Sequence, residues 1–189
     1  NQPDRSAPWY AEVTSAQWVV LAIASAGWIF DVYEGQLFTI FKTPMLTQLL
    51  DGDTKAVDFH ANVALAFFLV GGALGGLGFG MLGDRIGRVR VMSLTILSYS
   101  IFSALTYFVR SVWEVEALRL LVALGTGGEW AVAAALVSET FPPKARAFAS
   151  GTFHASSVLG GALAAVTGWL LVGEGAWRYG FLVGLAPAL

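Results

Sequence analysis

The chain of 189 residues contains no cysteine, has a formal net charge of −2, and has charged side chains at only 13% of its positions. A soluble domain carries roughly a quarter charged residues, and the mean hydropathy of +0.66 is correspondingly high. These features exclude a disulfide and argue against a nucleic-acid partner. The apolar runs of about 20 residues between the charged segments favour a protein that crosses the lipid bilayer several times. A soluble helical bundle is the disfavoured alternative, because its helices are apolar along one stripe only.

We predict six helical spans, in a single domain that covers residues 1–189. Their approximate bounds in chain order are 17–41, 60–82, 91–109, 113–137, 148–172 and 177–189. Pro142 and Pro143 separate the fourth span from the fifth, because proline cannot continue a helix. The sixth span, at about 13 residues, is too short to cross a bilayer. We therefore expect it to be truncated.

Lysine and arginine are unevenly divided between the two sides of these spans. One side holds Arg5, Arg85, Arg88, Arg90, Lys144 and Arg146, and the other holds Lys42, Lys55, Arg110 and Arg178. The less basic side also carries the loop acids Asp51, Asp53, Asp58, Glu114, Glu116 and Glu174. Because loops rich in Lys and Arg stay in the cytoplasm, we expect a cytoplasmic N-terminus in a multi-pass protein of the inner (plasma) membrane. A removable signal peptide is not indicated.

Small residues recur at every fourth position in two of the spans. The repeats are Gly72, Gly76 and Gly80; Gly71 and Gly75; and Gly160, Ala164 and Gly168. Such stripes let helix backbones approach closely in lipid, so they predict helix contacts.

Two acidic residues lie inside the first apolar span, where a charge costs about 2.5–3.5 kcal/mol. Asp31 and Glu34 are three positions apart, so their carboxyl groups project from one helix face. Two carboxylates this close cannot both ionise cheaply away from water, which makes them candidate proton-coupling residues. In the alternative interpretation, Asp31 caps a hydrogen-bond network and Glu34 reaches a water-filled vestibule.

Two further charges lie in the fourth span, at Arg119 and Glu129. An arginine stays protonated and needs a buried anion or water. Asp31 or Glu34 can supply that anion at rest, and a substrate carboxylate can supply it in bidentate fashion during transport. The alternative is that Arg119 snorkels to the outer interface.

We expect Glu129 to lie at the same depth as His154 of the fifth span, so the two side chains can pair. Histidine titrates near neutral pH, which makes a proton relay possible. Glu129 and His154 are therefore candidate substrate-binding residues together with Arg119. Alternatively, His154 is a polar residue satisfied by a neighbouring helix.

The turn between the second and third spans is charged and punctuated by glycine. Its residues are Gly80, Met81, Leu82, Gly83, Asp84, Arg85, Ile86, Gly87, Arg88, Val89 and Arg90. This stretch resembles the loop between the second and third helices of the major facilitator superfamily of solute transporters. The family pattern runs Gly-x-x-x-Asp-Arg-x-Gly-Arg followed by a basic pair, and Val89 stands where the first basic residue of that pair is usual.

Three more stretches resemble the same superfamily. Residues 119–129 fit its fourth-helix pattern, and residues 139–146 fit the Glu-x-x-Pro-x-x-x-Arg loop after that helix. Residues 28–34 look like the Asp-Gly-Phe/Tyr-Asp segment of proton-coupled metabolite and carboxylate symporters, with Val32 and Glu34 as departures. The run Gly-Gly-Glu-Trp at 127–130 is similar to that of symporters for organic acids and sialic acid.

The resemblance implies an all-α membrane fold of twelve helices in two halves, each half an inverted 3+3 repeat. This chain corresponds to the N-terminal half, whose partner is a missing C-terminal six-helix half. It also implies a conformational latch of Gly80, Asp84, Arg85, Gly87, Arg88, Arg90, Glu139 and Arg146. In the family, the carboxylate at the position of Asp84 contacts the opposite half.

The expected function is secondary transport of a small organic anion, a monocarboxylate or sugar acid, coupled to protons by alternating access. The expected partners are this substrate, protons and the lipid bilayer, with no cofactor, no metal and no catalytic residue. A sugar:proton symporter is the first alternative, and a non-transporting membrane sensor the second. An intramembrane enzyme is disfavoured because no nucleophile–base spacing or metal-ligand cluster occurs.

Overall fold

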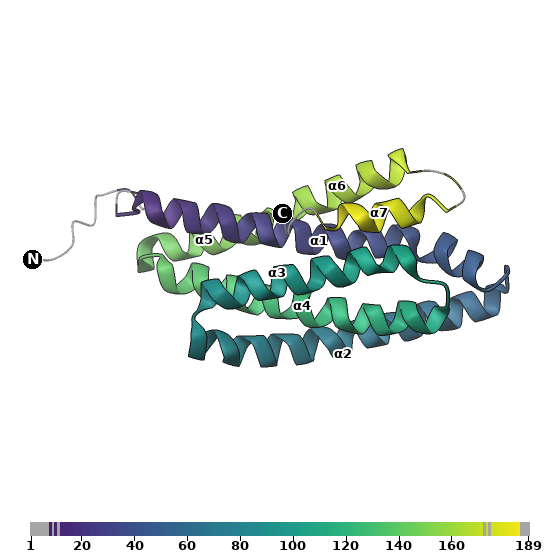
Figure 1. Ribbon diagram of the computed structural model, residues 1–189. Helices are drawn as coiled ribbons and strands as arrows, with labels where there is room; N and C mark the ends of the chain where they lie inside the picture. The colour runs from purple at the N-terminus through teal and green to yellow at the C-terminus, as the bar shows by residue number, and fades with distance from the viewer. Residues whose placement is uncertain (1–7, 9, 11, 172, 174, 186–189) are drawn as a thin grey trace, which may run out of the picture.

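The computed structural model describes residues 8, 10, 12–171, 173 and 175–185. This part of the chain forms an elongated bundle of antiparallel helices (Figure 1). The helices are α1 (Ser15–Leu49), α2 (Thr54–Ile86), α3 (Arg88–Leu105), α4 (Val112–Thr140), α5 (Pro143–Ala155), α6 (Ser157–Leu170) and α7 (Trp177–Val183), with a short 3-10 helix η1 (Thr106–Phe108) after α3. No strand occurs in the described ranges, and the all-α fold expected from the sequence is confirmed.

Local sequence signals set the helix ends. Thr14 and Gln17 form a capping box at the start of α1, and the Asp53 side chain accepts two backbone N–H bonds at the start of α2. Each cap satisfies donors that the first turn of a helix leaves unpaired. Between α2 and α3 the chain reverses at Gly87, whose φ of +98° suits glycine.

Five stretches are long and apolar enough to cross a membrane: Ser15–Leu49, Thr54–Ile86, Arg88–Phe108, Val112–Thr140 and Pro143–Leu170. They match the first five predicted spans, although α1 extends beyond residue 41 to Leu49 and α2 begins before residue 60, at Thr54. The fifth span is divided at Ser156, whose hydroxyl donates to Phe153 O at 2.6 Å. A serine hydroxyl that bonds the preceding turn in this way bends a helix.

Some sequence expectations lie outside the described residues. The described helix of the predicted sixth span is α7, of 7 residues, and residues 186–189 of that span are not described. The same holds for Val172 at the end of the fifth span, and for the loop charges Arg5 and Glu174.

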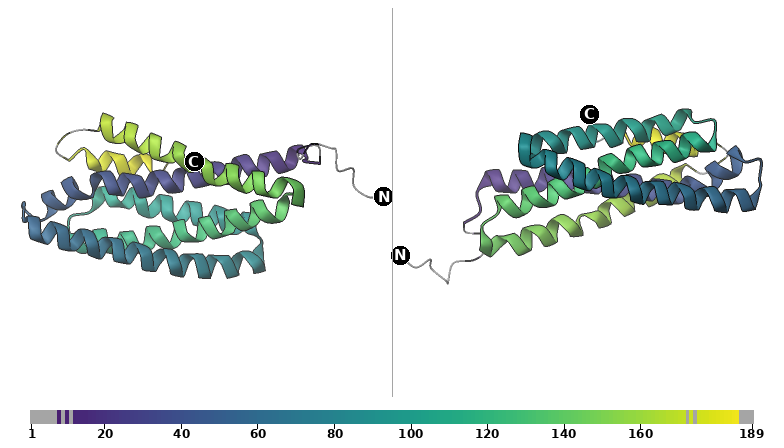
Figure 2. Two further views of the ribbon diagram at one scale, coloured as in Figure 1. Left: turned by 180° about the vertical axis from the view of Figure 1, so that it is seen from behind. Right: turned by 90° about the horizontal axis from the view of Figure 1, so that it is seen from below.

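Glycines allow α2 and α4 to pack along their lengths. A Cβ on Gly71 or Gly75 would overlap the backbone of α4 at Leu120 or Leu124, and a Cβ on Gly127 would overlap α2 at Gly72. Gly160 of α6 faces the backbone of α1 at Ile29 in the same way. Figure 2 shows α2 beside α4, and α6 beside α1, from two further sides. The small-residue stripes therefore lie at helix contacts where they were predicted. At Gly72 only the backbone makes the contact, because a Cβ added there, as at Gly80, would meet nothing within 4 Å.

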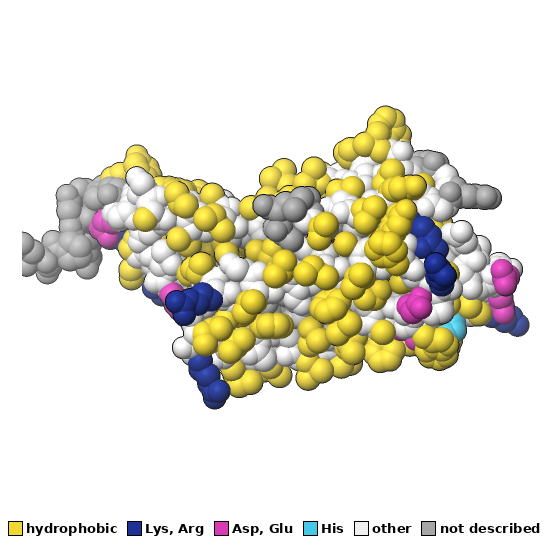
Figure 3. Space-filling view, in the orientation of Figure 1, with side chains coloured by type: hydrophobic (Ala, Val, Ile, Leu, Met, Phe, Trp, Pro, Cys, Tyr) yellow, Lys and Arg dark blue, Asp and Glu magenta, His cyan; other side chains and the backbone are white. Residues whose placement is uncertain are grey.

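The surface fits a bilayer. In Figure 3 the coloured acidic and basic side chains gather toward the two ends of the long axis, and apolar side chains cover the region between them. The N-terminal end of α1, the α2–α3 turn and the α4–α5 turn lie at the same end of the bundle (Figure 1). That arrangement places the more basic loops together.

Candidate functional site

A buried ion pair joins α1 to α4 in the interior of the bundle. Arg119 Nη1 donates to Glu34 Oε1 at 2.8 Å, and the two side chains are 0% and 1% exposed. Of the two acids expected as partners of Arg119, the structure therefore selects Glu34. Because Arg119 is fully buried, it does not snorkel to an interface.

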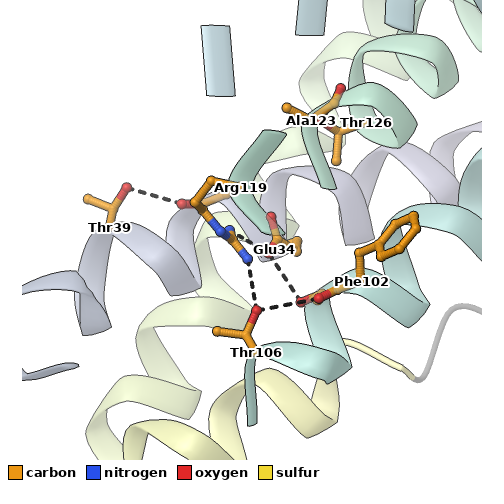
Figure 4. Close-up of polar contacts among 9 residues, drawn as sticks. Glu34, Thr39, Phe102, Thr106, Arg119, Ala123 and Thr126 are labelled. Carbon is orange, nitrogen blue, oxygen red and sulfur yellow. Dashed lines mark hydrogen bonds and ion pairs between the residues drawn. The ribbon is translucent and has the colours of Figure 1, made fainter. Parts of the chain in front are cut away.

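Hydroxyl groups and aromatic rings surround this pair, and Figure 4 shows the polar contacts of Arg119 and Glu34. Ser103 Oγ donates to Glu34 Oε1 at 3.1 Å, and Arg119 Nη2 donates to Thr106 Oγ1 at 3.3 Å. The guanidinium also lies over two rings, 4.6 Å from the centroid of Phe38 and 5.4 Å from that of Phe181. Aromatic faces attract a cation, so α7 as well as α1 helps to position Arg119.

The pair keeps unused hydrogen-bonding capacity. Glu34 Oε2 and Arg119 Nε are buried and have no hydrogen-bond partner in the described part of the chain. The contact is monodentate, although a guanidinium and a carboxylate can form two parallel bonds. Arg119 therefore retains a donor that a second anion can use.

Asp31 lies one turn before Glu34 but faces a different space. It lines a groove of about 750 Å³ between α1, α2 and α4 and is 8% exposed. Other lining residues are Trp28, Gln36, Thr126 and Trp130, together with glycines of α2. Asp31 is the one charged residue among the groove's lining residues in the described ranges. The two carboxyl groups were expected on one helix face, but Asp31 lines the groove whereas Glu34 lies in the interior beside Arg119.

Glu129 and His154, which were expected to pair, form no contact with each other in the described structure. The His154 ring is exposed and lies edge-on against Trp28 and Phe153. Glu129 is fully buried and faces α1 instead, where a Cβ on Gly27 would lie 2.7 Å from its Oε1. Similar depth along the helices was not sufficient for pairing, because Glu129 is buried against α1 whereas the His154 ring is exposed.

A fourth buried acid, Glu116, was not identified from the sequence as a buried residue. A hydrogen bond of 2.8 Å joins Oε1 of Glu116, on α4, to Nδ1 of His60, on α2. The Glu116 side chain is 2% exposed. Glu116 was expected among the loop acids, although it lies one turn before Arg119. Its i, i+3 spacing from Arg119 was the available signal that it belongs to the interior.

The predicted latch residues are partly brought together at the N-terminal end of the bundle. Arg88 contacts Asp84 at 2.6 Å and Glu139 at 3.0 Å, and its Nη1 donates to Gly80 O at 3.3 Å. This cluster ties the α2–α3 turn to the end of α4. Arg146 lies apart and donates to Phe141 O at 3.5 Å, while Arg85 and Arg90 are exposed and take no part in these contacts.

A comparison with family models identifies the fold's relatives. The model described as Major Facilitator Superfamily matches residues 35–189. The chain belongs to this superfamily. Its relatives are transporters rather than enzymes.

Two curated relatives and one solved structure are similar to this chain over most of its length. A probable 4-methylmuconolactone transporter of Cupriavidus pinatubonensis is 38% identical over 96% of this chain and 42% of its own length. The sialic acid transporter NanX of Escherichia coli is 26% identical over 96% of this chain and 44% of its own length. An inward-facing, occupied crystal structure of a bacterial homolog of the human lysosomal transporter Spinster superposes with a TM-score of 0.77 at 22% identity, over 93% of this chain and 43% of that one. The chain thus spans less than half the length of the proteins it matches, and the solved structure shows the major facilitator fold.

Proposed function

We propose that this chain is the N-terminal half of a secondary transporter that moves a small organic anion together with protons by alternating access. The superfamily membership supports transport, and two relatives named for a lactone acid and a sialic acid support an organic anion. The observation that carries the proposal is the buried Glu34–Arg119 ion pair, close to a groove that Asp31 lines.

The charge distribution favours an anion. No described Lys or Arg side chain lines the groove, and Arg119 lies two turns from the groove residue Thr126 on the same face of α4. Arg119 is therefore the cation of this chain best placed to attract an anion in the groove. Its unpaired Nε supplies a donor for that purpose.

The proposed cycle exchanges the partner of Arg119. Protonation of Asp31 or Glu34 weakens the hold of the acids on Arg119, because a neutral carboxyl attracts a guanidinium less than a carboxylate does. Arg119 then binds the substrate carboxylate. Loss of the proton on the cytoplasmic side restores the ion pair with Glu34 and releases the substrate.

The proposal includes an orientation and a latch. The more basic end of the bundle, with the N-terminus, faces the cytoplasm of an inner-membrane protein, as the positive-inside rule predicts. The Asp84–Arg88–Glu139 cluster lies at that end and ties α2, α3 and α4 together. We assign to it the control of conformation and not the binding of substrate.

A transport screen tests this function. The full-length protein is reconstituted in proteoliposomes, and the uptake of organic acids and neutral sugars is measured under an inward proton gradient. We expect accumulation of at least one organic acid above its equilibrium level and no accumulation of sugars. Accumulation of sugars alone would contradict an anionic substrate.

Arg119→Gln separates the two substrate classes further. If the substrate is an anion, this variant loses substrate binding itself, because the buried cation is gone. If the substrate is a sugar, binding persists and only proton coupling is lost. Arg110→Gln is the matched control, since Arg110 is exposed at the far end of the bundle and its removal should leave binding unchanged.

A further inference from the structure

A second acid lies within reach of Arg119 but does not bind it. Glu116 is 2% exposed and precedes Arg119 by three positions on α4, so the two residues are neighbours on the helix surface. A helical side chain leans toward the N-terminus of its helix, which for Arg119 is the direction of Glu116. The described structure nevertheless pairs Glu116 with His60 and Arg119 with Glu34.

His60 of α2 holds the Glu116 carboxyl group. Its Nδ1 lies 2.8 Å from Glu116 Oε1, and it is the one ion-pair partner of Glu116 among the described residues. The His60 ring is 16% exposed and lies edge-on against the rings of Trp113 and Phe59, at centroid distances of 5.7 and 5.2 Å. A hydrogen bond to a charged group is about twice as strong as one between neutral groups. His60 therefore determines the direction in which the Glu116 carboxyl group points.

Both Glu116 and Arg119 keep one polar atom unused. Glu116 Oε2 and Arg119 Nε are buried and have no hydrogen-bond partner in the described part of the chain. Leaving such atoms unpaired is costly. A Glu116 carboxyl group released from His60 therefore gains free energy by pairing with Nε of Arg119. That pairing occupies the donor that the proposed function leaves to a substrate carboxylate.

We propose that His60 is a positioning residue for substrate binding, because by holding Glu116 it keeps Arg119 available to the substrate. The inference rests on the proposed function, in which Arg119 binds the substrate carboxylate. An anion attached to the same helix competes at a high effective concentration. Without His60, the substrate has to displace Glu116 from Arg119, so its apparent affinity falls while the transport cycle itself continues.

Replacing His60 by leucine tests this role. His60→Leu keeps an apolar side chain beside Trp113 and Phe59 but cannot hold Glu116. The full-length protein is reconstituted in proteoliposomes, and the probe is the organic acid that accumulates most in the transport screen. We expect the KM of its counterflow to rise about tenfold, as for the loss of one hydrogen bond to a charged group, with the maximal rate largely unchanged. An unchanged KM would overturn the inference.

Two further variants separate positioning from packing. An asparagine at this place offers an amide N–H close to the position of Nδ1, so His60→Asn should hold Glu116 and keep KM near the wild-type value. His60→Leu combined with Glu116→Gln removes the competing charge, so its KM should also return to near the wild-type value. A KM that stays high in the double variant, or that rises equally in His60→Asn and His60→Leu, would mean that His60 acts through packing and would contradict the inference.

Asn62→Leu is the matched control. Asn62 is an exposed polar residue of the same turn of α2, and its amide donates to Asp58 O within that helix. Its replacement should leave KM unchanged. An equal rise of KM in Asn62→Leu and His60→Leu would count against a specific role of His60.

The same assay separates this inference from the proposed function. If no organic acid is exchanged even by the unaltered protein, the proposed function fails. If the unaltered protein exchanges an organic acid and His60→Leu exchanges it with the same KM, the proposed function stands and only the role of His60 is wrong.

Discussion

At the scale of single residues, two acids one turn apart on α1 have different partners. Glu34 is bound to Arg119 and to Ser103 in the interior, whereas Asp31 lines the groove. An ion pair that is removed from water is costly to break, because the remaining charge stays buried. The chemistry of these residues therefore depends on their neighbours more than on their position in the sequence.

Replacing Glu34 tests the ion pair directly. Glu34→Gln leaves the Arg119 guanidinium buried without a counter-ion, because an amide oxygen can accept a hydrogen bond but carries no charge. We expect a loss of about 3–5 kcal/mol in stability. Thermal unfolding of the purified protein in detergent measures this loss. Asp58→Asn, at an exposed acid of α2, is the control and should have little effect.

A double variant shows whether the loss comes from the unpaired charge. Glu34→Gln combined with Arg119→Met removes both charges at similar volume, so much of the lost stability should return. If Glu34→Gln alone unfolds at the wild-type temperature, Arg119 does not depend on Glu34 as its counter-ion.

The presence of charged residues inside the bundle was easier to predict than their pairing. Asp31, Glu34, Arg119 and Glu129 were recognisable because a charge in an apolar span is rare and costly. The Glu129–His154 pair was wrong because depth along a helix does not determine which way a side chain points. The rings of Phe38 and Phe181 carried no signal, since one more phenylalanine in an apolar span looks like ordinary packing.

At the scale of helices, the contact between α2 and α4 depends on backbone approach. Gly71 and Gly75 face the backbone of α4 directly. This contact fixes the position of α4, the helix that carries both Arg119 and Glu129. Without a hydrophobic force between helices in lipid, such packing is a main source of association. The glycines therefore support the site although they do not touch it.

A methyl group at Gly75 should loosen this contact. Gly75→Ala puts its Cβ against the backbone of Leu124, which cannot move aside as a side chain can, and overpacking of this kind costs about 1–3 kcal/mol. The melting temperature in detergent should fall, while that of Gly78→Ala, which adds a methyl group in open space, should not. Equal melting temperatures for the two variants would contradict the packing argument.

The latch belongs to the same scale, because one side chain connects three helices. Arg88→Ala removes the contacts with Asp84 and Glu139 and frees the end of α4 from the α2–α3 turn. We expect a changed rate of substrate exchange with little change in KM, measured by counterflow in the full-length protein. Arg90→Ala, at an exposed residue outside the cluster, should leave the rate unchanged; a similar effect of both variants would mean that charge alone, and not the Arg88 contacts, matters.

The helices were predictable from the sequence to within a few residues at most ends, because apolar length and proline or glycine punctuation are local signals. The extension of α1 to Leu49 was missed because a charged residue, Lys42, and a proline, Pro44, follow the predicted end of the first span at residue 41. A proline and a snorkelling lysine are both tolerated in membrane helices. The break at Ser156, whose hydroxyl bonds Phe153 O in the preceding turn, also escaped prediction, because a single serine in an apolar span is a weak signal.

At the scale of the whole molecule, the chain matches less than half the length of its relatives. It spans 42% of the length of its 4-methylmuconolactone-transporter relative, and its groove lies on the outside of the described bundle, bounded by α1, α2 and α4. A groove of this kind becomes a closed path only against a second set of helices, and transporters of this design bind substrate where the repeats meet. We therefore assign transport to the full-length protein.

In the proposed function, the acids of α1 couple protons to the movement of an organic anion. Asp31→Asn in the full-length protein tests it most directly, because this change removes the one charged residue that lines the groove in the described structure while keeping the size of the side chain. In proteoliposomes under an inward proton gradient, the variant should no longer accumulate substrate above its equilibrium level, whereas exchange of labelled for unlabelled substrate should remain partly intact. Uphill accumulation at the wild-type level in Asp31→Asn would contradict the mechanism.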